Sequence, residues 1–335
     1  KKRFHEVLEK CRYTSLDDEE EYSIDVIQPE KIEFKQNSYE DGENSIISFP
    51  EFLLLVLDVC TGGEQPASHY QPDKLIEKFD ALKTHFTAGE FYEKMLYYRL
   101  LLDYYTIRRD IKDGQGNYSL ILKGPKDDND KLKQYQSMLY VSTEAFYNWL
   151  KPYLRKLEQD ELQSCAEMLA FLKKEDNERH GVLPARKDLS YKASGNIRYW
   201  FWRLDYYLWE QRSTFFNEEE QKIVEHYVFR RNRSIEHLHP QDESHNEEWE
   251  EEAVHSFGNL AMISQSFNSQ QSNDHIQIKF ARIHEQISNK SLQSIKMFLM
   301  CKLADFNYQN WTMKLAKEHE NEMIEFLERS FYISD

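Results

Sequence analysis

Apolar residues recur every three or four positions along most of this chain, with charged and polar residues between them. That spacing places the apolar side chains on one face of an α-helix. The pattern therefore predicts a mainly α-helical protein. We expect helices over residues 49–58, 75–82, 91–108, 131–157, 161–174, 196–211 and 218–228, and over three C-terminal segments, the last from about 310 to 331.

The helical pattern is interrupted at residues 113–117 by the turn sequence Asp-Gly-Gln-Gly-Asn. The apolar-rich residues 118–122 follow at once, which predicts a short β-hairpin. The two glycines lack the Gly-Lys-Ser/Thr ending of a phosphate-binding loop, so we interpret them as turn residues.

Length and composition limit the class of protein. With 335 residues, of which 40% are hydrophobic, the chain can bury a large core and is long enough for two structural units. No apolar run approaches the roughly 20 residues that span a bilayer, so we expect no membrane association. Cys11, Cys60, Cys165 and Cys301 form no CxxC pair, which indicates reduced thiols and a cytoplasmic protein.

The formal net charge of −16 works against nucleic-acid binding, because phosphate contacts normally need a basic surface. A small basic patch can still bind phosphate within an acidic chain, since binding responds to the local field. Arg230, Arg231 and Arg233 form such a local cluster. We interpret them as candidate phosphate-binding residues, and the alternative is surface pairing with the acidic residues 242–252.

The residues most able to do chemistry gather in one short stretch of the C-terminal half. Residues 234–240 alternate briefly like a strand and stop at a proline. Residues 257–264 form a second strand candidate opened by a glycine turn, and residues 267–273 lead into a helical pattern. The predicted order is therefore strand, loop, strand, helix. The candidate site residues in these segments are Glu236, His237, Asn259, Asn268 and Asn273.

Three motifs in this stretch resemble the HNH (His-Me finger, ββα-metal) nuclease pattern. They are Glu-His-x-x-Pro at 236–240, Gly-Asn-Leu at 258–260 and Asn-x-x-x-Ser-Asn at 268–273. Most similar is the C-terminal nuclease region of the GmrSD-like, modification-dependent (type IV) restriction enzymes. In that branch an aromatic helix precedes the nuclease motif, and residues 198–210 resemble it. With this aromatic block, the resemblance reaches from about residue 196 to the end of the chain.

The resemblance implies a role for each matching residue. His237 corresponds to the general base that takes a proton from water, a role suited to an imidazole. Glu236 and Asn268 correspond to ligands of one divalent cation, Mg²⁺ or Mn²⁺. Asn259 corresponds to the residue that braces the loop holding the base. Asn273 is expected either to support the site through hydrogen bonds or to be purely structural. The implied reaction is phosphodiester hydrolysis that leaves a 5′ phosphate.

One physical condition applies to the pair Glu236 and His237. Neighbouring side chains point to opposite faces of a regular strand, so both can serve one site only if the strand ends or bends there. Pro240 and the long acidic loop that follows favour such an end.

Two further alternatives stay open at this stage. The aromatic residues of 199–209 could stack on bases, although a helix with aromatic residues on most sides is more often part of the core. His239 could form a transition-metal site with His245, His255 and His275, but their spacing matches no familiar ligand pattern.

The predicted organisation is a helical region over residues 1–190, followed by an HNH-type nuclease domain over residues 191–335 whose ββα-metal motif is embedded in helices. Enzymes of the GmrSD type carry an N-terminal ParB-like domain with an Asp-Gly-Gln-Gln-Arg type motif that handles nucleotide. This chain lacks that motif. We therefore expect no nucleotide hydrolysis by it, and we expect a missing N-terminal domain or partner to supply that function.

The implied function is a cytoplasmic, metal-dependent DNA endonuclease that restricts modified or phage DNA. Its expected substrate is double-stranded DNA, modified DNA included, with cleavage of one strand or of both. The alternative is a catalytically silent, helical DNA-binding or protein-interaction module with an HNH-like fold. The complete set of Glu-His, Asn and Asn favours the enzyme, because a silent descendant need not keep these groups together. The acidic net charge favours the alternative.

Overall fold

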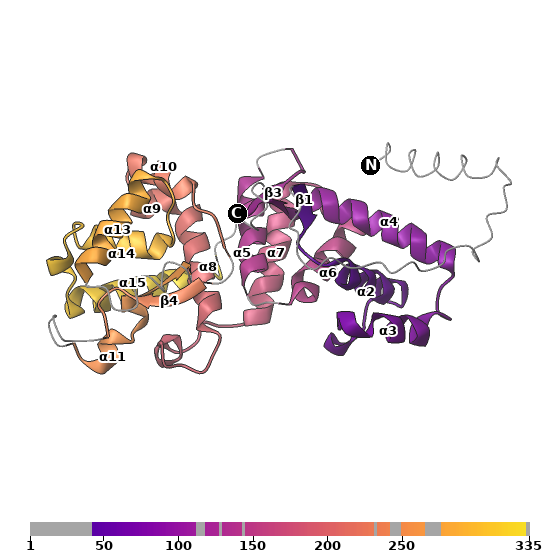
Figure 1. Cartoon of the computed structure of the whole chain (residues 1–335), viewed down its shortest axis with the longest axis horizontal. Coiled ribbons are helices and arrows are strands. Elements are labelled where there is room, and N and C mark those ends of the chain that lie inside the picture. Colours follow the sequence, from indigo (N-terminus) through magenta and orange to yellow (C-terminus); the bar gives the residue numbers. More distant parts are fainter. Residues whose placement is uncertain are drawn as a thin grey trace, which may run out of the picture. The chain divides into compact units, whose positions relative to one another are not determined.

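The computed structural model describes residues 42–111, 118–126, 129–142, 145–230, 233–241, 249–264 and 276–332. Over these residues the fold is mainly helical, as predicted, and it contains two small antiparallel sheets. Figure 1 labels the α-helices and some of the strands along the chain. Within the described part of the chain, no helix is both long enough and apolar enough to cross a membrane.

The first sheet joins strands in the order β1-β2-β3. Strands β2 and β3 form the predicted hairpin, with Ile107 opposite Leu122, while the predicted turn at 113–117 lies outside the described residues. The prediction of a helix as far as residue 108 is wrong. Thr106 is extended, and Ile107 enters the sheet with its side chain fully buried. The strands are β1 (Gly42–Ser45), β2 (Ile107–Ile111) and β3 (Tyr118–Leu122).

The helices before residue 190 start where polar side chains cap them. Helices α2, α4 and α7 each begin at a capping box, in which a Ser or Thr and a Glu three residues later satisfy each other's backbone N–H groups. The bounds are α2 (Phe49–Cys60), η2 (Ala67–His69), η3 (Pro72–Lys74), α3 (Leu75–Leu82), α4 (Ala88–Tyr105), α5 (Asp130–Val141), α6 (Phe146–Glu158), α7 (Cys165–His180) and η4 (Arg186–Leu189).

Two helix predictions in this region are wrong in their extent. The predicted helix over 131–157 is divided into α5 and α6, because α5 ends at Ser142, whose hydroxyl donates to the carbonyl oxygen of Leu139 at 2.7 Å. The helix predicted over 161–174 starts only after the Ser164 cap and then continues to His180 as α7.

The helices after residue 190 include the three predicted C-terminal ones, α13, α14 and α15. Helix α10 ends earlier than predicted, because His226 leaves helical geometry and its ring Nδ1 lies 2.6 Å from the carbonyl oxygen of Lys222. The bounds are α8 (Ile197–Glu210), α9 (Arg212–Phe215), α10 (Glu218–Glu225), α11 (Glu251–Val254), α13 (Ile276–Ser288), α14 (Ile295–Leu303), η6 (Tyr308–Asn310) and α15 (Met313–Arg329).

Helix α8 is buried along almost its whole length, including every residue of 199–209. Its aromatic block is therefore part of the core and offers no base-stacking surface. The fully buried guanidinium of Arg203 is paired with Asp176 on α7 at 3.2 Å and also donates to the hydroxyl of Tyr199. This ion pair joins residues on both sides of the boundary expected near residue 190, and that boundary stays a prediction.

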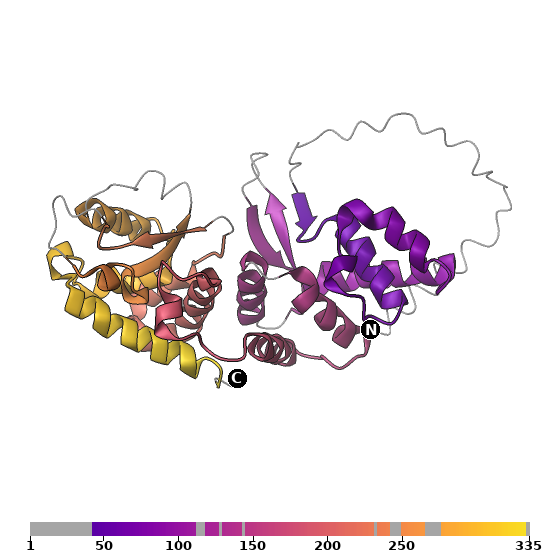
Figure 2. The same ribbon diagram turned by 90° about the horizontal axis from the view of Figure 1, so that it is seen from below.

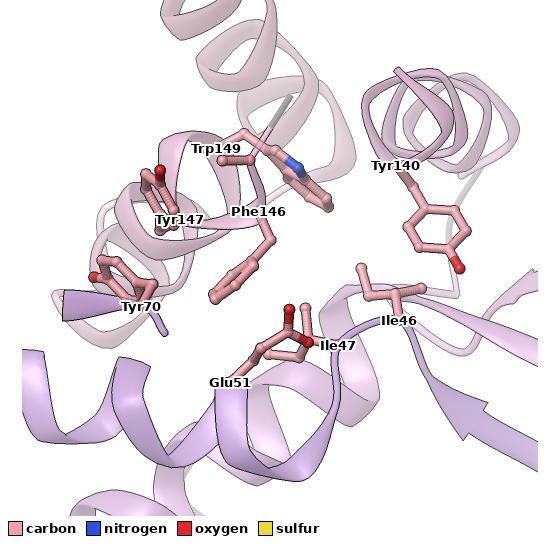
Figure 3. A pocket seen from close by; sticks show the side chains of 9 residues that line it. Ile46, Ile47, Glu51, Tyr70, Tyr140, Phe146, Tyr147 and Trp149 are labelled. Atoms are coloured by element: carbon pink, nitrogen blue, oxygen red, sulfur yellow. The ribbon is translucent and has the colours of Figure 1, made fainter. Parts of the chain in front are cut away.

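The described residues before residue 190 line at least two cavities. The first, of about 310 Å³, is shown in Figure 3, where Phe146, Trp149, Tyr140 and Glu51 surround the central space. The second, of about 540 Å³, has a more apolar lining that includes Phe79 and Phe91. Neither cavity is lined by the candidate residues of the C-terminal half, so neither belongs to the site predicted from the sequence.

Candidate active site

The predicted order of strand, loop, strand and helix is present in the C-terminal half. Strand β4 (Arg233–His237) pairs antiparallel with β5 (Leu260–Ser264), and Glu236 lies opposite Ala261 in the register. Figure 2 shows these two strands between helix α13 and the long helix α15, which is yellow. The first strand ends at His237, earlier than the predicted residue 240.

The second strand also starts later than predicted. Residues 257–259 form a 3₁₀ turn, η5 (Phe257–Asn259), before β5 begins. Gly258 allows this turn to pack against the backbone of α15, since a Cβ at Gly258 would lie 2.1 Å from the carbonyl oxygen of Ala316. The buried Nζ of Lys296 supports the same turn by donating to the carbonyl oxygens of Phe257 at 2.8 Å and Leu260 at 2.6 Å.

The close approach at Gly258 yields a first prediction. Gly258→Ala should lower the free energy of unfolding by about 1–3 kcal/mol, because the new methyl group would overlap α15. Urea unfolding followed by circular dichroism measures the change. Gly195→Ala is the matched control, since a Cβ there meets no atom within 4 Å. A Gly258→Ala protein as stable as the Gly195→Ala protein would contradict the packing described.

Asn259 is fully buried, and its carboxamide connects the two ends of the loop between the strands. Its Oδ1 accepts hydrogen bonds from the backbone N–H of His239 at 2.8 Å and from the indole of Trp311 at 3.2 Å. Its Nδ2 donates to the carbonyl oxygens of His239 at 3.0 Å and Val254 at 2.9 Å. The carboxamide therefore uses two donors and two acceptor positions to hold the segment that follows His237.

The imidazole of His237 is buried among polar and aromatic groups. Its Nε2 lies 3.1 Å from Nδ1 of His255, and its Nδ1 lies 3.0 Å from Nε2 of Gln241. The ring of Tyr191 meets the His237 ring edge to face, with 4.6 Å between centroids, and stacks on His255. These neighbours fix the plane of the His237 ring and leave 5% of the residue exposed.

Burial lowers the pKa of His237 to about 3, and the positive charges that His255 and Lys279 can carry act in the same direction. Burial also lowers the pKa of His255. Both imidazoles are therefore neutral near pH 7, which is the form in which a histidine can accept a proton. A phosphate anion beside His237 would act in the opposite direction and make the ring more basic.

The carboxylate of Glu236 faces helix α13, where it forms a buried ion pair with the ammonium of Lys279. The same ammonium donates a hydrogen bond to the backbone carbonyl oxygen of His237. Lys279 therefore connects the end of β4 to α13 through one side-chain and one backbone contact. Glu236 and His237 direct their side chains to different neighbours, as adjacent strand residues do, but Lys279 holds both residues at the end of the strand.

The remaining sequence candidates are only partly placed. Asn268, Asn273 and Arg231 lie outside the described residues, as does the side chain of Arg233. Arg230 is exposed. The structure thus brings Glu236, His237 and Asn259 together around one loop and leaves the second proposed metal ligand untested.

The histidine alternative finds no support among the described residues. His239 stacks on Trp249, with ring centroids 4.1 Å apart and planes 5° from parallel, and His245 and His275 lie outside the described residues. In the described part of the chain, no group of three or more His, Cys, Asp or Glu side chains is placed to hold a metal ion. A site with one carboxylate and carboxamide ligands is a different kind of site, and it fits the hard oxygen donors that Mg²⁺ and Mn²⁺ prefer.

Lys279 and Gln241 contact the site but were missed in the sequence. Lys279 had a visible signal, because it lies on the same face of its helix as Ile276, Phe280 and Ile283, which are all buried. A lysine on an apolar face indicates a buried partner for its charge. Gln241 had no such signal, since it is one polar residue in a polar loop.

One comparison with known proteins found a match, and it covers the part of the chain that contains these residues. Residues 184–326 match the family described as GmrSD restriction endonucleases, C-terminal domain. No curated protein and no solved structure matches the chain. The matched segment contains β4, η5, β5 and α13, with Glu236, His237 and Asn259. This part of the chain is therefore similar to the C-terminal domain of GmrSD restriction endonucleases, which points to a nuclease role in restriction.

Proposed function

We propose that the chain is an HNH-type, metal-dependent DNA endonuclease whose site lies at the end of β4. The observation that carries the proposal is the arrangement around one loop. Glu236 and His237 are the last two residues of the first strand, and the carboxamide of Asn259 holds the loop that follows through hydrogen bonds to the backbone of His239. All of these residues lie in the segment that matches the restriction endonuclease domain.

In this proposal His237 is the general base. Its neutral imidazole takes a proton from the attacking water, after one of its ring nitrogens has exchanged its present partner for that water. His255 and Tyr191 keep the ring plane fixed while this happens. Asn259 acts through the loop, because its four hydrogen bonds keep His237 from moving relative to β5.

Glu236 and Asn268 would hold one Mg²⁺ or Mn²⁺ ion. The fit is supported by the buried carboxylate of Glu236, whose oxygens are the hard ligands that these ions prefer, and a bound ion would have to share it with the ammonium of Lys279. When bound, the ion would supply stabilisation of the charge on the phosphate and on the departing 3′ oxygen. We further propose that Asn273 supports the site through hydrogen bonds.

The substrate follows from the same proposal. Arg230, Arg231 and Arg233 precede β4 and are the residues we assign to phosphate contacts. We propose double-stranded DNA, modified DNA included, as the substrate, and a ParB-like domain or partner as the nucleotide-dependent part of a cytoplasmic restriction system. Products would carry a 5′ phosphate.

A second candidate function is a catalytically silent module with the same fold. Two observations favour it, namely the net charge of −16 and the pairing of Glu236 with Lys279, which occupies the carboxylate in the structure described. The two candidates differ in one measurable property, the hydrolysis of DNA.

Cleavage of supercoiled plasmid tests the proposed function. With Mg²⁺ or Mn²⁺ the protein should convert the plasmid to nicked or linear DNA, and EDTA should stop the reaction, because the proposed hydrolysis needs the cation to stabilise the charge on the phosphate and the departing 3′ oxygen. Unmodified and modified plasmid are compared in parallel. Cleavage that continues in EDTA would contradict the metal requirement, and no cleavage of either plasmid would favour the silent module.

A further inference from the structure

Lys279 is a buried lysine that makes two polar contacts at the end of β4. Its side chain is 4% exposed, and the side chain of Glu236 is 8% exposed, so both charges of the ion pair are out of water. The ammonium also donates to the carbonyl oxygen of His237. Among the described residues these two contacts place a cation between the proposed metal ligand and the backbone of the proposed base.

A buried carboxylate gains most from one compensating positive charge. If a divalent ion binds Glu236 while the ammonium stays, two cations share one carboxylate within a few ångströms of each other. Their repulsion is strong in a region with little water, where charges are weakly screened. The ion must therefore displace Lys279 or bind with reduced affinity.

We propose that Lys279 holds the place of the divalent cation at Glu236 and thereby sets the metal affinity of the protein in the absence of DNA. The inference rests on the proposed function, because it takes Glu236 as a metal ligand. The further point is that the carboxylate of Glu236 is already paired, so the ion has to compete with the ammonium of Lys279. Lys279 is in this sense a positioning residue whose charge regulates the site.

The test measures metal binding rather than cleavage. Mn²⁺ binding to the DNA-free protein is measured from the electron paramagnetic resonance signal of unbound Mn²⁺, for the wild type, Lys279→Gln, Lys279→Arg and Glu236→Gln/Lys279→Gln. We expect Lys279→Gln to bind Mn²⁺ at least about tenfold more tightly than the wild type. Lys279→Arg should stay weak because it keeps the charge, and the double variant should lose the tight binding.

Lys302 offers a matched control. It makes the same two kinds of contact, with the carboxylate of Glu220 and with the carbonyl oxygen of Phe215, but it is on α14. Lys302→Gln should leave Mn²⁺ affinity unchanged. If Lys279→Gln does not fold without metal, Mn²⁺ should restore its thermal unfolding transition, and failure to restore it would overturn the inference.

The remaining outcomes separate the inference from the proposed function. Equal and measurable Mn²⁺ affinity in the wild type and Lys279→Gln would overturn the competition but leave a metal site. Tight binding that persists in the double variant would place the ion away from Glu236. No Mn²⁺ binding in any folded variant would contradict the metal site itself, and with it both claims.

Discussion

Asn259→Asp should destabilise the protein by at least about 3 kcal/mol. Asn259 is fully buried, and its Nδ2 donates to the carbonyl oxygens of His239 and Val254. Aspartate has no donor at that position, so a carboxylate oxygen would face two carbonyl oxygens. The variant would lose two hydrogen bonds and would also bury a negative charge without a positive partner. Both effects lower the free energy of unfolding.

Urea unfolding followed by circular dichroism measures this loss. Asn307→Asp is the matched control, because Asn307 is exposed and its side chain only accepts a hydrogen bond, from the backbone N–H of Gln309 at 3.1 Å. An aspartate can accept the same bond, so this variant should unfold near the wild-type midpoint. An Asn259→Asp protein as stable as Asn307→Asp would mean that Asn259 does not brace the loop.

The helical part of the fold could largely be predicted, because burial follows the spacing of apolar residues. Helix α8 is the clearest example, since its aromatic block predicts a helix and the structure buries nearly all of it. The break between α5 and α6 could not be predicted in the same way. It depends on one serine hydroxyl that competes for a carbonyl oxygen, and no glycine or proline marks the position.

The order of the two strands was predicted correctly, but the residues at which β4 ends and β5 begins were not. Pro240 indicated that the first strand ends at residue 240, but β4 ends at His237. Beyond that point the backbone N–H and carbonyl oxygen of His239 form hydrogen bonds with the side chain of Asn259 and not with a strand. Strand β5 begins later than predicted because Gly258 packs against α15, which is distant in sequence. Contacts of this kind follow from the tertiary structure and not from local pattern.

The candidate site was predicted from its motifs, and the residues outside those motifs, Lys279 and Gln241, were not predicted. Glu236, His237 and Asn259 are recognisable as residue types in a fixed order. The neutral state of His237 depends on its burial and on the nearby His255 and Lys279, which only the fold brings together. The roles of these residues in cleavage stay predictions.

The loss of cleavage in His237→Ala is the largest effect on activity that we expect. Alanine removes the only group that we assign to proton transfer from water, and general base catalysis contributes about 10² to 10⁴ in rate. The variant should keep its fold, because the two strands and Asn259 are unchanged and their contacts do not involve the imidazole. Circular dichroism and thermal unfolding check that condition before any rate is compared.

The role of His237 as general base is tested most directly by the rate of supercoiled plasmid cleavage in Mg²⁺ by the wild type, His237→Ala and His226→Ala. His226 is an exposed histidine at the end of α10, where its ring Nδ1 lies 2.6 Å from the carbonyl oxygen of Lys222, so its loss should leave the rate unchanged. We expect the wild type and His226→Ala to cut at the same rate, and folded His237→Ala to cut at least about 10²-fold more slowly. Cleavage by folded His237→Ala at the wild-type rate would contradict this role, because the reaction would then take place elsewhere in the protein.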